Sequence, residues 1–187
     1  MGVPVNSLAS PRFCGVRTFQ RLPHSADCSG NDFAVLGVPF DTATSYRPGC
    51  RFGPAAIRDA SSILKSYHSV LDVDIFEHCQ GVDAGDVDII PGYLDESFER
   101  IEAAVAGVLD AGAVPVIMGG DHSISIPVGR ALEENGKKIC VIQFDAHLDW
   151  TSHVGPLVQG NGSPMRRMSE MNHIGQMVQI GLRGMGS

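Results

Sequence analysis

The sequence predicts an α/β fold, specifically a three-layer sandwich in which a mostly parallel sheet lies between helices. Two observations lead to this prediction. Short apolar runs alternate along the chain with longer segments of helical periodicity, and parallel strands need such helical crossovers. In addition, 43% of the 187 residues are hydrophobic, which is enough for the buried core of one domain. We expect residues 1–31, rich in Pro, Ser and Arg, to form an N-terminal arm, and residues 32–187 to form the α/β domain.

Five apolar segments are expected to be strands. Residues 33–38 and 139–144 are continuous apolar runs, which is typical of a strand that is buried on both faces. The other three expected strands are residues 81–87, 114–118 and 176–181. All of them are short enough for a sheet of ordinary size.

Four segments carry helical signals. Residues 94–111 repeat apolar side chains at helical spacing, and Gly112 follows where a helix C-cap belongs. Residues 54–64 begin with Pro, which favours the first turn of a helix. The other two expected helices are residues 125–134, stopped by Asn135-Gly136, and residues 164–170, capped by Ser163. In the helix at 54–64, one apolar face is expected from Ile57, Ala60, Ile63 and Leu64.

Charge and composition argue against several classes of partner. The chain has 14 Lys and Arg against 21 Asp and Glu, a net charge of −7, and no basic cluster that would bind nucleic acid. Its apolar runs are far shorter than the ~20 residues of a membrane-spanning helix. Five scattered cysteines without a C-x-x-C pair indicate reduced thiols. We therefore expect a cytoplasmic protein; a mitochondrial location stays open because Arg12, Arg17 and Arg21 precede the first acidic residue.

Polar clusters follow the expected strands. In open parallel sheets, ligands bind beyond the carboxyl ends of the strands, so these clusters should lie together along one edge of the sheet. We expect the functional site at this edge. The clusters are residues 39–42, 85–86, 119–123, 145–149 and 181–184.

Asp145, His147 and Asp149 alternate directly after the apolar run at 139–144. Alternate side chains of an extended strand point the same way, so the three are expected to converge. Carboxylates with an imidazole suit Mn, Fe or Zn, and His122, at the end of the preceding strand, is a candidate fourth ligand. Each of these residues alone would more often have a structural role, in a turn, a cap or a hydrogen bond to the backbone; their arrangement together favours a metal site.

The two motifs Gly-Gly-Asp-His-Ser-Ile at 119–124 and Phe-Asp-Ala-His-Leu-Asp at 144–149 resemble those of the ureohydrolases, the arginase/agmatinase family. Residues 37–42 and 47–58 are similar to the agmatinase branch, and the similarity runs from about Arg12 to Ser187. The resemblance implies an arginase-like fold and hydrolysis of a guanidino compound, such as agmatine or a guanidino acid, to urea and an amine. It also implies two Mn²⁺ ions, a small guanidino substrate as partner, and assembly as a homo-oligomer, a trimer or hexamer.

By this resemblance, His122, Asp145 and Asp149 are ligands of one Mn²⁺, and His147 is a ligand of the second. Asp145 resembles the catalytic carboxylate that bridges the two ions. A metal-bridging hydroxide would then attack the guanidinium carbon.

The sequence departs from the family pattern in two ways. Asn161 stands where many relatives have a histidine; it can hydrogen-bond the substrate in a catalytic or binding role, but it cannot titrate. The family's third metal motif, a Ser-x-Asp-x-Asp, is absent, so we expect the C-terminal part of the family domain to be missing. Asp41, in a loop at the mouth of the site, is a further candidate for substrate binding, whereas Arg51 and Arg58 are expected to pack helix and loop.

The sequence leaves two alternatives to an amidinohydrolase. One is a truncated, inactive ureohydrolase paralogue that acts as a binding or regulatory subunit, which the missing metal motif favours. The other is a metallophosphoesterase, which also uses Asp-x-His. That class places its Asp-x-His on the first strand, whereas here Gly-Gly-Asp-His at 119–122 precedes Asp-x-His-x-Asp at 145–149.

Overall fold

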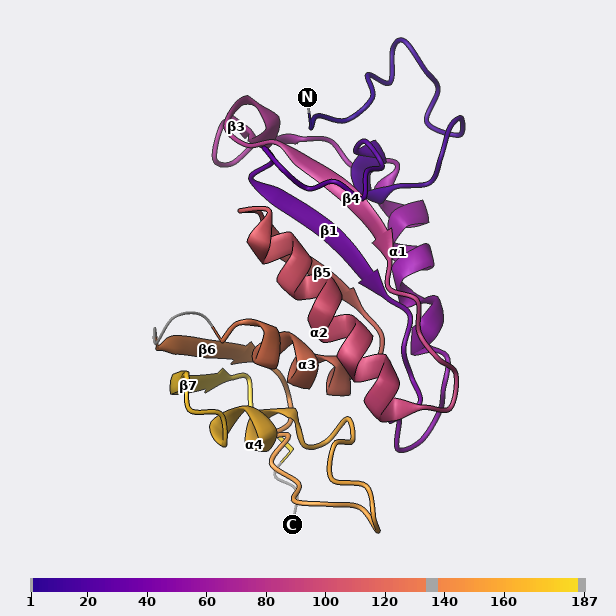
Figure 1. Ribbon diagram of the computed structural model, residues 1–187. Helices are drawn as coiled ribbons and strands as arrows, with labels where there is room; N and C mark the ends of the chain where they lie inside the picture. The colour runs from indigo at the N-terminus through magenta and orange to yellow at the C-terminus, as the bar shows by residue number, and fades with distance from the viewer. Residues whose placement is uncertain (1, 134–137, 185–187) are drawn as a thin grey trace.

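The computed structural model of the protein describes residues 2–133 and 138–184. Three parallel strands, β4 (Gly81–Asp86), β1 (Phe33–Val38) and β5 (Val114–Gly119), form a sheet in the order β4-β1-β5. A second parallel ladder pairs β6 (Ile139–Phe144) with β7 (Ile174–Ile180) (Figure 1). The predicted α/β class with parallel strands is confirmed, but the described parallel strands form two separate sheets rather than one continuous sheet.

Alternation along β1 creates the three layers. Leu36 and Val38 pack against α2 (Leu94–Asp110), whereas Val35 faces the opposite side, where it contacts Leu22 of the N-terminal segment. On that second side, α1 (Gly53–Ser61) also contacts the sheet. The predicted helices therefore cover both faces of the β4-β1-β5 sheet.

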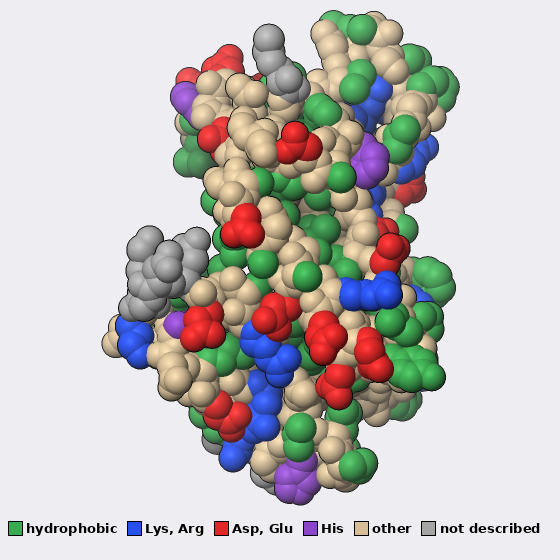
Figure 2. Space-filling view, in the orientation of Figure 1, with side chains coloured by type: hydrophobic (Ala, Val, Ile, Leu, Met, Phe, Trp, Pro, Cys, Tyr) green, Lys and Arg blue, Asp and Glu red, His purple; other side chains and the backbone are tan. Residues whose placement is uncertain are grey.

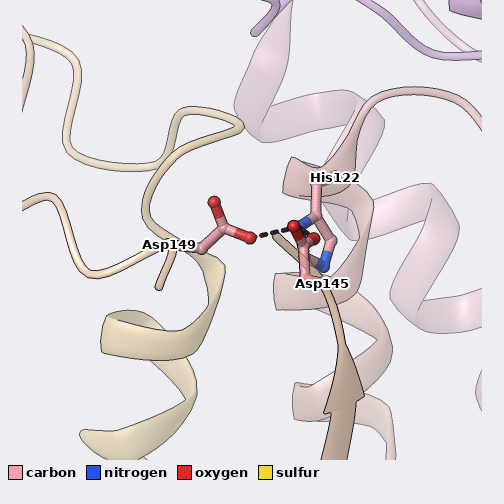
Figure 3. A group of neighbouring side chains, drawn as sticks. All are labelled: His122, Asp145 and Asp149. Carbon is pink, nitrogen blue, oxygen red and sulfur yellow. Dashed lines mark ion pairs between the residues drawn. The ribbon is translucent and has the colours of Figure 1, made fainter. Parts of the chain in front are cut away.

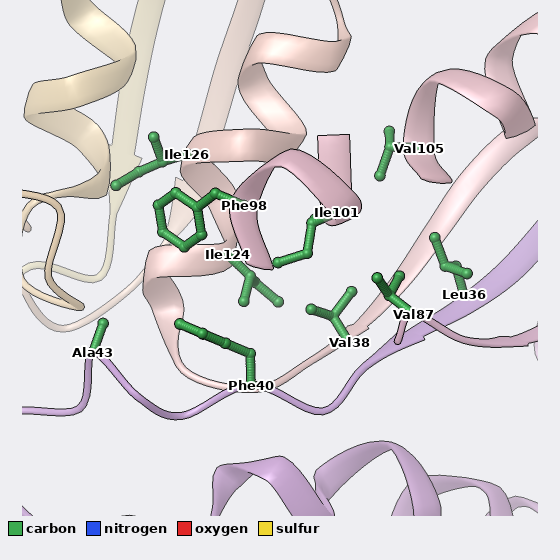
Figure 4. Close-up of a cluster of buried hydrophobic side chains, with 10 residues drawn as sticks. All are labelled: Leu36, Val38, Phe40, Ala43, Val87, Phe98, Ile101, Val105, Ile124 and Ile126. Atoms are coloured by element: carbon green, nitrogen blue, oxygen red, sulfur yellow. The ribbon is translucent and has the colours of Figure 1, made fainter. Parts of the chain in front are cut away.

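The main core lies between β1 and α2. Phe98 and Ile101 of α2 point toward Val38 and Phe40, and all four side chains are at most 1% exposed (Figure 4). The rings of Phe40 and Phe98 lie 5.7 Å apart and are tilted by 58°, a favourable aromatic arrangement. This core holds the segment that follows β1 close to the end of β5.

The two remaining helices lie near the second ladder. A single turn of 3-10 helix (His122–Ile124) leads into α3 (Ser125–Ala131), and α4 (Pro164–Ser169) packs against α3 and β7. The predicted stop at Asn135-Gly136 lies outside the described residues. A short hairpin of β2 (Tyr67–His68) and β3 (Val73–Asp74) was not predicted.

The burial predicted for β6 is wrong. Ile142 is 62% exposed and Phe144 is 78% exposed, while Ile139 and Val141 pack against Met165 and Met168 of α4. Among the described residues β6 pairs with β7 alone, so helices cover one face of this ladder and leave the other open.

The apolar face predicted for α1 is also wrong. Ile57, Ile63 and Leu64 are exposed, whereas Arg58 is buried. The cause is Asp83 of β4, which is fully buried and needs a cation. Nε and Nη2 of Arg58 donate to its two oxygens at 2.8 and 2.9 Å, so α1 turns its charged side inward.

The N-terminal segment is attached to the edge of β4 by the same aspartate. The backbone N–H of Phe19 donates to Asp83 Oδ2 at 2.7 Å, and the N–H of Asp83 donates to the carbonyl of Pro23 at 2.9 Å. The carbonyl of Asp83 accepts from the N–H of Ser25 at 3.1 Å. Residues 19–25 therefore lie along the sheet as part of the fold.

Basic and acidic side chains are mixed on the surface, as expected from a sequence without a cluster of Lys and Arg. On the face shown in Figure 2, Lys and Arg side chains lie among Asp and Glu side chains. All five cysteines are free thiols.

Within the part of the chain that the structure describes, every helix is too short or too polar to cross a bilayer.

The Arg58–Asp83 pair gives a prediction on stability. The substitution Arg58→Met should lower the free energy of unfolding by about 3–5 kcal/mol, because it leaves the Asp83 carboxylate buried without a partner. Chemical denaturation measures this loss. Arg17→Met is the matched control, since Arg17 pairs with Asp59 at the surface, where side chains are 47% and 72% exposed. If Arg17→Met lowers the free energy of unfolding as much as Arg58→Met does, the special role of the buried ion pair is contradicted.

The same pair predicts how stability depends on pH. Burial alone would raise the pKa of Asp83, but hydrogen bonds from Arg58 and from backbone N–H groups outweigh it and lower the pKa. A carboxyl with a lowered pKa stabilises the fold above its ordinary pKa near 4 and loses that contribution as the pH falls further. The stability difference between wild type and Arg58→Met should therefore narrow below about pH 4. A difference that stays constant from pH 6 to pH 2 would contradict this assignment.

Candidate metal centre

His122 is placed by a sharp turn at the end of β5. Gly120 has a φ of +36°, and a Cβ at this position would lie 2.5 Å from the carbonyl oxygen of Phe40 and 2.6 Å from that of Val38. Only glycine allows the chain to pass this close to the end of β1. His122 then opens the 3-10 turn directly beyond this approach.

Asp121 ties this turn to the segment that follows β1. Its side chain is buried, with Oδ1 accepting from the backbone N–H of Ser123 at 2.9 Å. Oδ2 accepts from the N–H of Ala43 at 3.1 Å and from the hydroxyl of Thr44 at 3.3 Å. The position of His122 is thereby coupled to the loop at residues 41–45.

Three of the predicted ligands form one group. His122 Nδ1 lies 2.7 Å from Asp149 Oδ2 and 3.7 Å from Asp145 Oδ2. One ligand atom from each residue lies within 4.8 Å of the others. Two atoms bound at right angles to one ion, each at about 2.1 Å, would lie about 3 Å apart, so these separations fit a common divalent cation. Figure 3 shows the side chains converging from the 3-10 turn, the end of β6 and the loop before α4.

His147 lies beside this group rather than in it. Its side chain is 70% exposed, with Nδ1 3.4 Å from Asp145 Oδ1, and its backbone N–H donates to the same oxygen at 2.9 Å. Asp145 therefore turns one oxygen toward His122 and the other toward His147, as a carboxylate that bridges two ions would.

Asp145 and Asp149 are brought beside His122 by a turn, and not by the alternation of side chains along a strand that the sequence predicted. β6 ends at Phe144, and Asp149 has a φ of +50°, in the left-handed region. An extended segment would have carried Asp149 well away from His122. The chain instead folds back, and Asp149 returns to the imidazole.

The charges of the group shift its pKa values. The hydrogen bond to Asp149 raises the pKa of His122, with the charges of Asp149, Asp145 and Asp121 adding to it against the effect of burial. Burial raises the pKa of Asp145, but the backbone N–H of His147 and the two histidines outweigh burial and lower it. The site thus favours an anionic Asp145 and a positive charge between the carboxylates.

A cavity of about 510 Å³ opens beside the group. Asn161 lines the cavity, and its backbone N–H donates to the carbonyl of Ala43 at 3.3 Å. A contact between Asn161 and substrate stays a prediction. Trp150, which is 45% exposed, lines the same cavity. The lining residues are Ser45, His147, Leu148, Asp149, Trp150, Thr151, Asn161, Gly162 and Gly184.

Asp41 makes structural contacts. Its side chain is completely buried, with Oδ1 accepting from Arg51 Nε at 2.7 Å and Oδ2 from the backbone N–H of Gly49 at 2.6 Å. Both oxygens therefore hold the loop at residues 49–51. A contact between Asp41 and substrate stays a prediction that these hydrogen bonds do not favour, while the packing role expected for Arg51 is observed.

Two glutamines beside the metal group were missed in the sequence. Gln143 Nε2 donates to Asp149 Oδ2 at 2.8 Å, and Gln179 donates to Gln143. The available signal was a single polar residue, Gln143, within the otherwise apolar run at 139–144.

The sequence pattern that defines the Arginase family matches residues 31–187. The chain belongs to the Arginase family. The resemblance predicted from the two motifs is confirmed, and the cluster of His122, Asp145 and Asp149 is thus the candidate metal centre of an Arginase-family chain.

Relatives agree with this placement. Proclavaminate amidinohydrolase of Streptomyces clavuligerus is 36% identical over 186 residues, which cover 96% of this chain and 58% of the relative. Its solved structure superimposes with a TM-score of 0.87 at 35% identity, covering 95% of this chain and 60% of that one. The mitochondrial agmatinase of Gallus gallus is 35% identical over 97% of this chain and 54% of its own length. The chain therefore spans a little over half the length of these relatives.

A solved structure in the same family contains manganese. Formiminoglutamase of Trypanosoma cruzi with Mn²⁺ is 30% identical, with a TM-score of 0.73, and the match covers 84% of this chain and 55% of that one. Carboxylates such as those of Asp145 and Asp149 are ligands that suit Mn²⁺.

The geometry predicts that the chain binds Mn²⁺ through His122. Added Mn²⁺ should bind measurably by titration calorimetry, and His122→Ala should weaken binding at least about tenfold, because it removes one of three grouped ligands. Affinity should rise from pH 5.5 to 7.5, since Asp149 raises the pKa of His122 and protons compete with the ion below that value.

His78→Ala is the control for this measurement, because His78 is exposed and lies outside the cluster. Equal Mn²⁺ binding by the His122→Ala and His78→Ala variants would contradict the role of His122.

Proposed function

We propose that this chain is part of a manganese-dependent amidinohydrolase, which cleaves a guanidino compound to urea and an amine. The observation that carries the proposal is the placement of Asp145, whose two oxygens face His122 and His147. Membership of the Arginase family and the relatives named for amidinohydrolase and agmatinase activity support it.

The proposed metal ligands divide between two ions. His122, Asp145 and Asp149 would hold one Mn²⁺, and Asp145 with His147 would contribute to the second. When bound, such ions lower the pKa of a water ligand and so supply a nucleophile at neutral pH.

Asn161, which lines the cavity beside the proposed metal ligands, would bind and orient the substrate. The amide oxygen of Asn161 can accept a hydrogen bond from a guanidinium N–H. Water would then add to the guanidinium carbon and the carbon–nitrogen bond to the alkyl chain would break. The oxygen stays in urea, and the amine leaves as an ammonium ion that carries both protons of the attacking water, since Asn161 does not titrate and cannot supply a proton.

A binding or regulatory subunit without turnover is the second candidate. The observation that favours it concerns the second ion position. Among the described residues, Asp145 is the one carboxylate within 4.0 Å of His147 Nδ1, and the His147 side chain is 70% exposed. Such a chain would bind metal and a guanidino compound but would release no urea.

We propose agmatine or a guanidino acid as substrate, because both carry the same guanidinium head group. We further propose a cytoplasmic protein that assembles as a trimer or hexamer; the mitochondrial agmatinase of Gallus gallus keeps a mitochondrial location as the alternative.

Urea release tests the function. The chain is incubated with Mn²⁺ and agmatine, 4-guanidinobutyrate or 3-guanidinopropionate, and we expect urea from at least one. Asp145→Asn should lower kcat by about 100-fold or more, because the amide removes the charge that holds the ions.

Asp110→Asn, at the exposed end of α2, is the control and should keep wild-type turnover. Binding of Mn²⁺ and a guanidino compound without urea would favour the non-catalytic alternative. If Asp145→Asn releases urea as fast as wild type, the proposed role of Asp145 in the site is wrong.

A further inference from the structure

A chain of hydrogen bonds runs from β7 through β6 to the candidate metal centre. Gln143 and Gln179 are direct neighbours in the parallel register of β6 and β7. Gln179 Nε2 donates to Gln143 Oε1, and Gln143 Nε2 donates to Asp149 Oδ2 at 2.8 Å. Asp149 Oδ2 is the same atom that lies 2.7 Å from His122 Nδ1.

The orientation of both amides is determined by a backbone group. Gln179 Nε2 also donates to the carbonyl of Leu148 at 2.7 Å. A carbonyl oxygen can only accept, so the Gln179 atom that faces it must be nitrogen. The Gln143 atom next to that nitrogen must then be oxygen, and the far end of Gln143 presents N–H to Asp149.

Gln179 thus acts on Asp149 twice. Through Gln143 it directs an N–H at the carboxylate, and through the Leu148 carbonyl it holds the peptide that precedes Asp149. Asp149 has a φ of +50°, a conformation that costs free energy unless its surroundings enforce it. The two contacts hold both the backbone and the carboxylate in the position that meets His122.

We propose that Gln143 and Gln179 are positioning residues for metal binding, which set the orientation of Asp149 through a relay anchored on the Leu148 carbonyl. The inference rests on the metal centre of the proposed function. Hydrogen bonds that orient a ligand typically change metal affinity by about 10–100-fold when they are removed. Gln143 is 7% exposed, so water does not readily replace its amide as donor.

The relay is tested by Mn²⁺ titration calorimetry on three leucine variants of the chain. Gln143→Leu and Gln179→Leu should each weaken Mn²⁺ binding by about 10–100-fold. Gln176→Leu is the matched control, since Gln176 is an exposed glutamine of the same strand and should bind Mn²⁺ within about twofold of wild type.

A fourth variant separates orientation from packing. Gln143→Met keeps nearly the length of the side chain but removes the N–H donor without adding a charge, so Mn²⁺ binding should weaken about as much as in Gln143→Leu. The melting temperature of each metal-free variant is measured beside its affinity. A purely structural role would lower that temperature and leave the affinity of the folded fraction unchanged.

The results distinguish the relay from the metal centre itself. If wild type binds Mn²⁺ and Gln143→Leu, Gln143→Met and Gln179→Leu bind it equally well, the relay is wrong and the proposed function stands. If wild type binds no Mn²⁺, the metal centre fails and the relay with it.

Discussion

The contact between His122 and Asp149 is the interaction on which the candidate site depends, because it joins two parts of the fold that share no ladder. His122 follows β5 in the three-stranded sheet, whereas Asp145 and Asp149 follow β6 in the second ladder. The carboxylates of Asp145 and Asp149, each with an oxygen within 4.8 Å of the other, repel each other unless a positive charge lies between them. An imidazolium or a divalent cation satisfies that requirement, so the fold brings together the groups that metal chemistry needs.

The rest of the structure holds the two sides of this contact. On the β5 side, the core between β1 and α2 fixes the strand ends, and Asp121 ties the turn of His122 to Ala43. On the β6 side, Gln143 and the left-handed backbone of Asp149 aim the carboxylate. A ligand set that is pre-organised in this way binds its ion without the cost of ordering flexible side chains.

Elements with a clear period were predictable from the sequence, and elements whose burial depends on a distant partner were not. The spacing of Phe98 and Ile101 predicts α2 and its buried face correctly. Apolar spacing predicts the wrong buried face for α1, because Arg58 is buried there to pair with Asp83, which lies 25 positions further along the chain. The motifs identify His122, Asp145 and Asp149, but the exposure of His147 and the donor role of Gln143 depend on a turn that no local pattern encodes.

An anomalous diffraction map from crystals of the chain soaked in Mn²⁺ tests the central claim most directly. Our account predicts a peak about 2.0–2.3 Å from His122 Nδ1 and from one oxygen each of Asp145 and Asp149. A peak at other residues, or a map without a peak at this cluster while Mn²⁺ saturates the protein in solution, would contradict it.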